Sequence, residues 1–247
     1  MIIRGDSIAE CWLKALIKVT EGNSRELSPV IVSFQTNIPP PSYKEKLEND
    51  LNCYLQSINK ATIDTIASTI FPKSLSSNPK MIYDRFNKIW PNIKKYPQNK
   101  NGNYFRRLTA YGEKDGKPFN QLQHITDAYN GNDVRKPVHR RSALIALTFD
   151  PMKDHTFQRQ RGFPCLQQVC FVPESKGKKL TLTAIYAMQY LGERAYGNYL
   201  GLQNLGNFMA EEMGLKLDKI NCISSVLSLA MKKTDAQEII NKYKNVL

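Results

Sequence analysis

The 247-residue chain is 41% hydrophobic, enough for a sizeable core, and has a formal net charge of +13. It has no run of about 20 apolar residues, and its first residues, MIIRGDSIAECW, include acidic side chains where a signal peptide is apolar, so we expect a cytoplasmic protein without a membrane span. Its five cysteines show no paired spacing, which argues against a disulfide framework and against a structural zinc site.

Apolar residues recur at helical spacing along much of the first half of the chain. Ser7 and Glu10 have the spacing of a capping box and precede the first such run, which Gly22 ends. In chain order we expect a helix over 8–21, a strand over 29–36, a helix over 39–58, a loop over 71–79, a helix over 81–93 that ends near Pro91, and a short helix over 120–130 that Gly131 ends.

The hydrophobic period changes after residue 140. The continuously apolar stretch RSALIALTFD (141–150) predicts a buried strand. We further expect strands over 167–173 and 179–190 joined by a hairpin loop, a helix over 199–213 that stops at Gly214, a strand over 219–230, and a last helix that Thr234 and Gln237 open. Helices and strands alternate irregularly without a repeat or linker, so we predict a single α+β domain over 1–247 with a mixed sheet.

Several stretches, taken in order, carry a family resemblance. They are PCLQQ (164–168), the hairpin after it, and RAYGNYLGLQNLGNFMAEEMGLKLDKI (194–220); weaker ones are YFRRLTAYG (104–112), NQLQHI (120–125) and HRRSALIALTFDP (139–151). Together they resemble the thymidylate synthase and pyrimidine hydroxymethylase superfamily. The archaeal-type thymidylate synthases have a similar Arg-Ala-Tyr-Pro-Ala-Asn run, which opens a long helix ending in Glu-Glu-x-Gly-Leu. The resemblance covers residues 100–225 well and the first hundred loosely.

This resemblance implies a fold, a dimer and a reaction. The fold would be a three-layer one, and two sheets would pack back to back in an obligate homodimer. Each active site would take two arginines from the partner subunit to hold the nucleotide phosphate. The cysteine of the Pro-Cys motif would attack C6 of a pyrimidine, and C5 would accept a one-carbon unit from a reduced folate, as in methyl- and hydroxymethyltransferases.

Cys165 is the expected nucleophile. A reactive thiolate needs nearby positive charge or a helix N-terminus, and Arg159 and Arg161 stand within six residues of it. The alternative is a buried cysteine that acts only as a small apolar side chain. That alternative is our interpretation of the other four cysteines, Cys11, Cys53, Cys170 and Cys222.

The resemblance also indicates the substrate-binding residues. Asn198 matches an amide that reads the O4 and N3 edge of the pyrimidine; the alternative is a helix cap. Arg140 and Arg141 stand two residues earlier than the family's partner-subunit phosphate clamp; the alternative is a solvated strand end. Further substrate contacts are expected from Arg161, Gln167, Gln168, Arg194 and Tyr196.

Three departures from the family pattern argue against an ordinary thymidylate synthase. The family's phosphate-binding Arg-Ser-x-Asp aligns with residues 188–191, Met-Gln-Tyr-Leu, none of which binds phosphate as an ion. The family's His-x-Tyr, which grips the sugar, aligns near Ser228 and Ala230. The C-terminal NKYKNVL does not resemble the family's closing tail.

Two functional hypotheses follow. Basic residues gather in 88–107 and 134–141, with Tyr and Phe among them, which indicates a nucleotide or nucleic-acid partner; the alternative is a generally basic surface. The first hypothesis is a divergent enzyme that modifies C5 of a pyrimidine nucleotide or nucleoside through Cys165, with or without a folate. The second is a catalytically inert dimer that binds a nucleotide or nucleic acid as a sensor or accessory subunit. A scaffold that kept only the fold is a third, weaker hypothesis.

Overall fold

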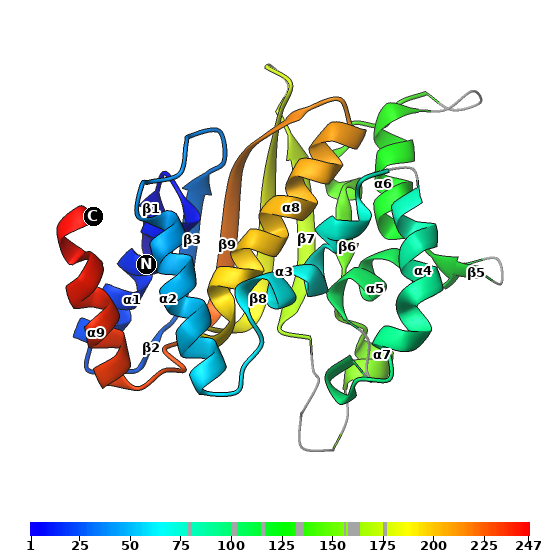
Figure 1. Ribbon diagram of the computed structural model, residues 1–247. Helices are drawn as coiled ribbons and strands as arrows, with labels where there is room; N and C mark the ends of the chain where they lie inside the picture. Colours follow the sequence, from blue (N-terminus) through cyan, green and yellow to red (C-terminus); the bar gives the residue numbers. More distant parts are fainter. Residues whose placement is uncertain are drawn as a thin grey trace.

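The computed structural model describes residues 1–78, 81–99, 103–114, 117–131, 136–155, 157, 164–174 and 177–247 (Figure 1). The strands of its large sheet are β1 (Ile2–Gly5), β2 (Glu26–Leu27), β3 (Val30–Gln35), β6 (Ile145–Leu147), β7 (Leu166–Pro173), β8 (Lys179–Tyr190) and β9 (Lys216–Ser228). A separate hairpin consists of β4 (Tyr111–Lys114) and β5 (Lys117–Phe119). The helices are α1 (Ile8–Glu21), α2 (Lys44–Ser57), α3 (Ile63–Ile70), α4 (Ile82–Ile93), α5 (Tyr104–Thr109), α6 (Gln121–Asn130), α7 (Pro151–Asp154), α8 (Tyr196–Glu212) and α9 (Lys233–Tyr243).

The large sheet is mixed. Its strand order is β1-β3-β9-β8-β7-β6, and β2 pairs with one end of β9. β1 runs parallel to β3 and β8 parallel to β9, whereas the other neighbouring pairs are antiparallel. The helix α8 connects the parallel strands β8 and β9, because parallel neighbours need a crossover between them. The prediction of an α+β protein with a mixed sheet and flanking helices is confirmed.

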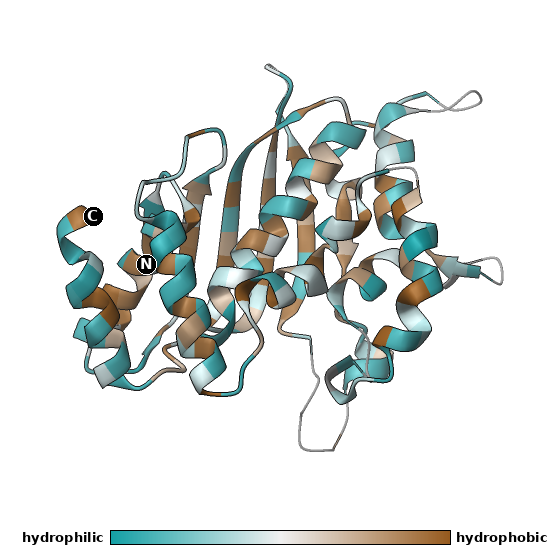
Figure 2. Ribbon diagram, viewed as in Figure 1, coloured by the Kyte–Doolittle hydropathy of each residue, from teal (hydrophilic) through white to brown (hydrophobic). Residues whose placement is uncertain are grey.

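The main helices lie on one side of this sheet (Figure 1). α1 and α8 pack directly on the strands, α3 packs on α8, and α9 packs on α1. Hydrophobic and hydrophilic residues alternate along the strands (Figure 2), as expected when a sheet has one covered face. On β8 the fully buried side chains, which face the helices, are Leu180, Leu182, Ala184 and Tyr186.

The opposite face of the sheet, which we call the open face, has its own side-chain pattern. One row across β1, β3, β9 and β8 consists of Ile2, Ile31, Ile223 and Ile185. Ile2 is 55% exposed and the other three are partly exposed. A contiguous apolar row on an exposed sheet face is typical of an interaction surface.

The neighbouring row on the open face is polar. Ser33, Asn221 and Thr183 stand opposite one another on β3, β9 and β8. The Ser33 hydroxyl donates to Asn221 Oδ1 over 2.8 Å, and Asn221 Nδ2 donates to Thr183 Oγ1 over 3.4 Å. These bonds satisfy the polar groups within the chain, so the row can be covered by a partner without leaving them unpaired.

Two glycines let α3 approach α8 closely. A Cβ atom at Gly197 would stand 2.6 Å from the Ile66 Cβ, and one at Gly201 would stand 2.7 Å from the Ala67 carbonyl oxygen. Both distances are shorter than any side chain allows. The four-residue spacing of the glycines places them on one face of α8, and α3 packs against this face.

Some elements differ from the sequence predictions. The stretch 141–150 contributes only the three-residue β6, which forms one edge of the sheet and leaves Leu147 39% exposed. Short edge strands are usual because they limit unpaired backbone. α4 continues past Pro91 to Ile93, and α9 begins at Lys233 without a side-chain cap. The elements α3, α5 and β1 were not predicted.

Replacing Gly197 by Ala is expected to destabilise the protein by about 1–3 kcal/mol, because the new methyl group overpacks the α3–α8 crossing. The free energy of unfolding is measured by urea denaturation. Asn207→Ala at an exposed position of α8 is the control, and its expected effect is within about 0.5 kcal/mol. Equal effects of the two substitutions would contradict the close packing.

Candidate functional site

Cys165 directly precedes β7, and neighbouring segments hold its backbone in place. Its carbonyl oxygen accepts from the Ala187 amide of β8 at 2.9 Å. The next amide, that of Leu166, donates to the phenol oxygen of Tyr104 at 3.4 Å, and the Leu166 carbonyl accepts from the Thr148 hydroxyl. The half-buried Cys165 is therefore fixed by β8, by α5 and by the segment after β6.

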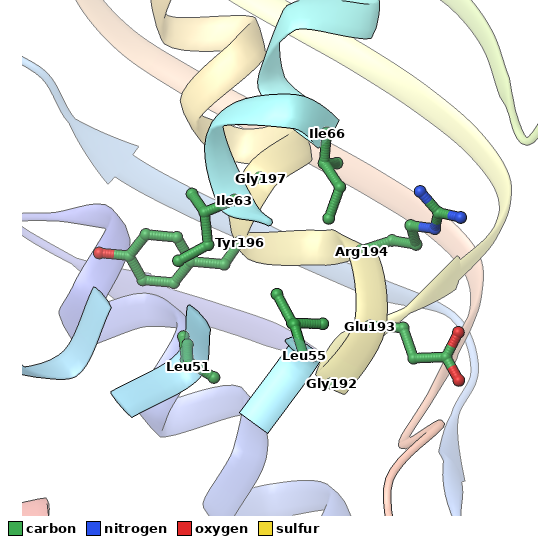
Figure 3. A pocket seen from close by; sticks show the side chains of 9 residues that line it. All are labelled: Leu51, Leu55, Ile63, Ile66, Gly192, Glu193, Arg194, Tyr196 and Gly197. Carbon is green, nitrogen blue, oxygen red and sulfur yellow. The ribbon is translucent and has the colours of Figure 1, made fainter. Parts of the chain in front are cut away.

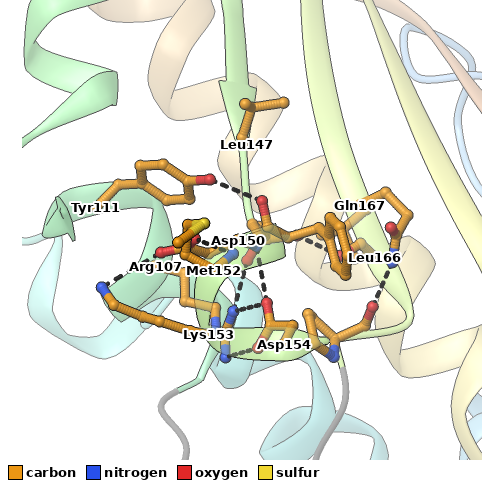
Figure 4. A network of polar contacts seen from close by, with 12 residues as sticks. Arg107, Tyr111, Leu147, Asp150, Met152, Lys153, Asp154, Leu166 and Gln167 are labelled. Atoms are coloured by element: carbon orange, nitrogen blue, oxygen red, sulfur yellow. Dashed lines mark hydrogen bonds and ion pairs between the residues drawn. The ribbon is translucent and has the colours of Figure 1, made fainter. Parts of the chain in front are cut away.

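A buried ion pair supports this corner of the molecule (Figure 4). Arg107 of α5 makes two hydrogen bonds to the carboxylate of Asp154 in α7, one of 2.7 Å, and a third of 2.8 Å to the Thr148 carbonyl. The Asp150 amide donates to Asp154 Oδ2 at 2.8 Å. Because Thr148 also holds Leu166, this network fixes the start of β7 relative to α5 and α7.

Arg194 supplies positive charge to the thiol of Cys165. Burial raises the pKa of this thiol above its ordinary value, and the guanidinium of Arg194 acts in the opposite direction. Burial also raises the pKa of the Tyr104 phenol to about 12, while Cys165 and Arg194 both contribute to its electrostatics. The predicted residues Cys165 and Arg194 therefore share one environment, and Tyr104 belongs to it.

A π-helix over Leu191–Ala195 positions Arg194 immediately before α8. The indole of Trp12 donates to the Leu191 carbonyl at 2.9 Å, and the Gly192 amide donates to the Leu229 carbonyl at 3.0 Å. A Cβ at Gly192 would lie 2.7 Å from the Met231 Cβ, so only glycine fits. Such π turns are frequent at functional sites. Arg194 is exposed and makes no ion pair within the described part of the chain.

Asn198 lies about one helical turn after Arg194, in the first turn of α8. It is only 6% exposed, yet its amide makes no hydrogen bond to any described residue. Among the described residues, the polar side-chain atoms that are both fully enclosed and without a partner belong to Thr20, Tyr186 and Gln189. The amide atoms of Asn198 are not among them. The amide of Asn198 therefore keeps contact with open space, as a group awaiting a ligand would.

Tyr196 does not share this environment. Its hydroxyl donates to Glu48 Oε1 at 3.0 Å, and its ring packs edge-on against Trp12. Figure 3 shows its ring and the guanidinium of Arg194 pointing to opposite sides. Between them lies a small hollow of about 10 Å³, lined largely by aliphatic side chains of α2 and α3, which is too small for a nucleotide. We therefore assign Tyr196 to the packing of α8 against α1 and α2.

Neither of the two predicted glutamines offers a free amide beside Cys165. Gln167 turns its amide back to the Pro164 carbonyl and so braces the turn before the strand. Gln168 lies on the open face, in register with Ile185, and contacts the Cys170 sulfur at 3.5 Å. Thus only Gln167 stays near the thiol, and its amide is already used. Arg161, like Arg159, lies outside the described residues.

Arg140 and Arg141 lie far from the Cys165 of their own chain, near the C-terminal ends of α6 and α8. The Val138 amide donates to the Ala128 carbonyl near the end of α6, and Asn130 donates to the Glu212 carbonyl at the end of α8. Arg194 and Asn198 stand at the opposite end of α8, roughly 25 Å away for a helix of 17 residues. Within one chain the two arginines therefore do not meet Cys165.

Sequence reasoning missed two polar groups behind the site. The Tyr186 hydroxyl and Gln189 Nε2 are fully enclosed and have no hydrogen-bond partner among the described residues. Gln189 Oε1 accepts from the Ser224 hydroxyl at 2.8 Å. Gln189 is one of the residues aligned with the family's phosphate-binding motif, and its 2% exposure places it in the core rather than at a ligand. Simple alternation along β8 would have placed Gln189 on the open face, because the buried positions change from even to odd residue numbers between Tyr186 and Gln189.

Tyr104 was also missed, although it belongs to the quoted YFRRLTAYG stretch. Its contact with Leu166 spans 62 residues of sequence, so no local pattern could reveal it. The cysteines other than Cys165 lie elsewhere: Cys11 and Cys222 are buried, Cys53 is exposed, and Cys170 lies on the open face. No group of three potential metal ligands occurs among the residues that the structure describes.

No protein-family model matches this chain, and no curated protein matches it. Across the described ranges, every helix is too short or too polar to cross a lipid bilayer.

Replacing Arg194 by Gln is expected to slow alkylation of Cys165 by iodoacetamide severalfold at pH values below the thiol pKa. The thiolate is the reacting form, and it loses the positive charge beside it. Peptide mass spectrometry resolves the modification of each cysteine across a pH series. Arg4→Gln, an exposed arginine on β1, is the control. Equal Cys165 rates in the two variants would contradict the pairing with Arg194.

Proposed function

We propose that this protein binds a pyrimidine nucleotide or nucleoside derivative and modifies C5 after the Cys165 sulfur adds to C6. The observation that carries the proposal is a thiol held from three segments beside the exposed, unpaired Arg194. The unpartnered amide of Asn198, one helical turn away, supports it because an amide can donate to one atom of a pyrimidine edge and accept from the next.

The proposed chemistry follows from these groups. The Cys165 thiol loses its proton to solvent, and the thiolate forms a bond to C6 while the C5–C6 π electrons move onto the O4 side of the ring. Arg194 favours the thiolate, and Asn198 would stabilise the charge that develops at the ring edge. C5 then bonds to a one-carbon electrophile and loses its proton to solvent, and the sulfur–C6 bond breaks, which restores the C5–C6 double bond and returns the Cys165 thiolate.

A reduced folate is the one-carbon donor implied by the family resemblance. The described residues do not single out a folate site, so no step of the proposal depends on it. The departures from the family pattern at 188–191 also argue against ordinary deoxyuridylate as the substrate, and the core position of Gln189 supports this.

A homodimer through the open face is part of the proposal. The isoleucine row offers apolar surface, and the adjacent polar row has its hydrogen bonds already made within the chain. A two-fold axis would place the same row of each copy against the other. The back-to-back packing of sheets, and the use of Arg140 and Arg141 as a clamp from the partner, remain proposals of the same kind.

Addition at C6 makes the hydrogen on C5 exchangeable, so the protein is expected to replace this hydrogen with deuterium in D₂O. The exchange is followed by proton NMR with a panel of pyrimidine nucleotides and nucleosides, and it needs no one-carbon donor. Cys165→Ser is expected to abolish it. Cys170→Ser, on the open face five residues later, is the matched control and is expected to retain it.

Exchange at the same rate in Cys165→Ser would contradict covalent catalysis. Absence of exchange with every pyrimidine, together with saturable binding that Asn198→Ala weakens, would favour the second hypothesis. In that case the chain is an inert nucleotide-binding protein. The raised pKa of Cys165 favours this second candidate, because a thiol that stays protonated at neutral pH is a poor nucleophile.

Ile223→Lys is expected to weaken self-association by on the order of 100-fold, because it buries an unpaired ammonium group at the centre of the open face. Sedimentation equilibrium measures the association constant. Ile38→Lys is the control, since Ile38 is 42% exposed and lies outside the sheet. A wild-type protein that stays monomeric at micromolar concentration would contradict the dimer.

A further inference from the structure

A basic surface with aromatic rings lies on α4, on the residues just after it, and on α5. We call it the α4–α5 surface, and its residues are Lys88, Trp90, Lys94, Lys95, Tyr96 and Arg106. The proposed chemistry at Cys165 does not use it. Within 81–99 and 103–110 the one acidic residue is Asp84, which stands in the first turn of α4.

The centre of this surface is a fixed stack of Arg106 on Trp90. The guanidinium carbon lies 5.6 Å from the centroid of the indole, and Arg106 Nη1 donates to Asn87 Oδ1 at 2.7 Å. Beneath the stack, Phe86 contacts Trp90 and meets Phe105 edge-on at 4.7 Å between centroids. Because these rings continue into the core, the stack is already ordered before any ligand binds.

Cations and a further ring extend the stack. Lys94 is the C-cap of α4, and Lys95 follows in the turn after the helix, where its ammonium donates to Asn92 Oδ1 at 3.1 Å. Tyr96 is 60% exposed. None of the lysines of this surface, nor Arg106, forms an ion pair with a described residue. Their charge is therefore free to neutralise phosphates.

We infer that the α4–α5 surface binds single-stranded nucleic acid. Unpaired lysines and an arginine suit a phosphate backbone, and exposed or edge-exposed rings suit unpaired bases, since every base has a face that stacks. An acidic protein would match the cations but leave the exposed ring of Tyr96 without a planar partner. The chain's net charge of +13 adds long-range attraction for the same ligand.

The surface and the Cys165 corner lie on either side of one short helix. Tyr104 and Arg106 are two residues apart in α5, and Tyr104 holds the Leu166 amide beside Cys165. The two sites are therefore separated by about one helix diameter, roughly 10 Å. The substrate class that follows, which rests on the proposed function, is a pyrimidine base within a nucleic-acid strand.

The test is fluorescence anisotropy of a labelled 20-nucleotide single strand with the full-length protein over a salt series. Lys94→Glu/Lys95→Glu is expected to weaken binding at least tenfold and to lower the salt slope by about 1.4, since each phosphate contact on a single strand contributes about 0.7. Tyr96→Ala is expected to weaken binding on the order of tenfold without changing that slope, because stacking is not ionic.

Lys233→Glu/Lys244→Glu makes the same change in net charge on and just after α9, at the other end of the molecule (Figure 1), and is expected to leave affinity within about twofold. An equal loss in both double variants would overturn the inference, because binding would then follow net charge alone. Duplex DNA or polyglutamate bound as tightly as the single strand would also overturn it.

Cys165→Ser separates this inference from the proposed function. The variant is expected to bind the single strand with unchanged affinity. If the protein binds the single strand but exchanges the C5 hydrogen of no pyrimidine, the nucleic-acid-binding surface is supported and the proposed enzymatic function is contradicted. Exchange in free nucleotides but not in the strand would overturn the assignment of the substrate class.

Discussion

The hydrogen bonds at the start of β7 determine where the Cys165 thiol can lie. β8 holds the Cys165 carbonyl through Ala187, and α5 and the segment after β6 hold the two sides of Leu166 through Tyr104 and Thr148. These three segments meet only when the sheet is paired and α5 is docked by the Arg107–Asp154 ion pair. The geometry of the thiol is therefore a property of the whole fold.

Local signals made much of the fold predictable. The Ser7 hydroxyl accepts from the Glu10 amide at 3.2 Å, as the capping box predicted, and Gly131 and Gly214 have the positive φ of helix ends. Along β8, Leu180, Leu182 and Ala184 alternate with threonines, and these three apolar side chains are buried. These signals act over a few residues, which is the range that sequence patterns report.

The parts that could not be predicted depend on contacts between distant segments. The apolar stretch that contains β6 is equally compatible with a central strand. β6 is an edge because the described residues place a neighbouring strand on one side of it alone. Tyr104 and Arg194 approach Cys165 from segments about 60 and 30 residues away in sequence. Gln168 was misplaced because an irregularity between Leu166 and Gln168 changes the alternation of β7, and this irregularity has no sequence mark.

Burial and charge oppose each other at Cys165. Burial is the larger effect, so the pKa of the thiol lies above its ordinary value even though Arg194 lowers it. The nearby Tyr104 phenol, with its pKa of about 12, does not serve as a base at neutral pH. A nucleophilic Cys165 therefore needs further positive charge beyond what the described residues of one chain bring to it.

The proposed dimer would supply that charge. Arg140 and Arg141 lie at the end of α8 opposite Arg194, so they cannot act on the thiol of their own chain. In a dimer packed through the open face, the exposed Arg140 and Arg141 of one copy would extend toward the partner subunit. Phosphate bound by such a clamp would also be neutralised by it, which would prevent the ligand's own charge from raising the thiol pKa further. Catalysis and dimerisation are thus one proposal: if the open face stays uncovered, the electrostatics of Cys165 favour a binding protein over an enzyme.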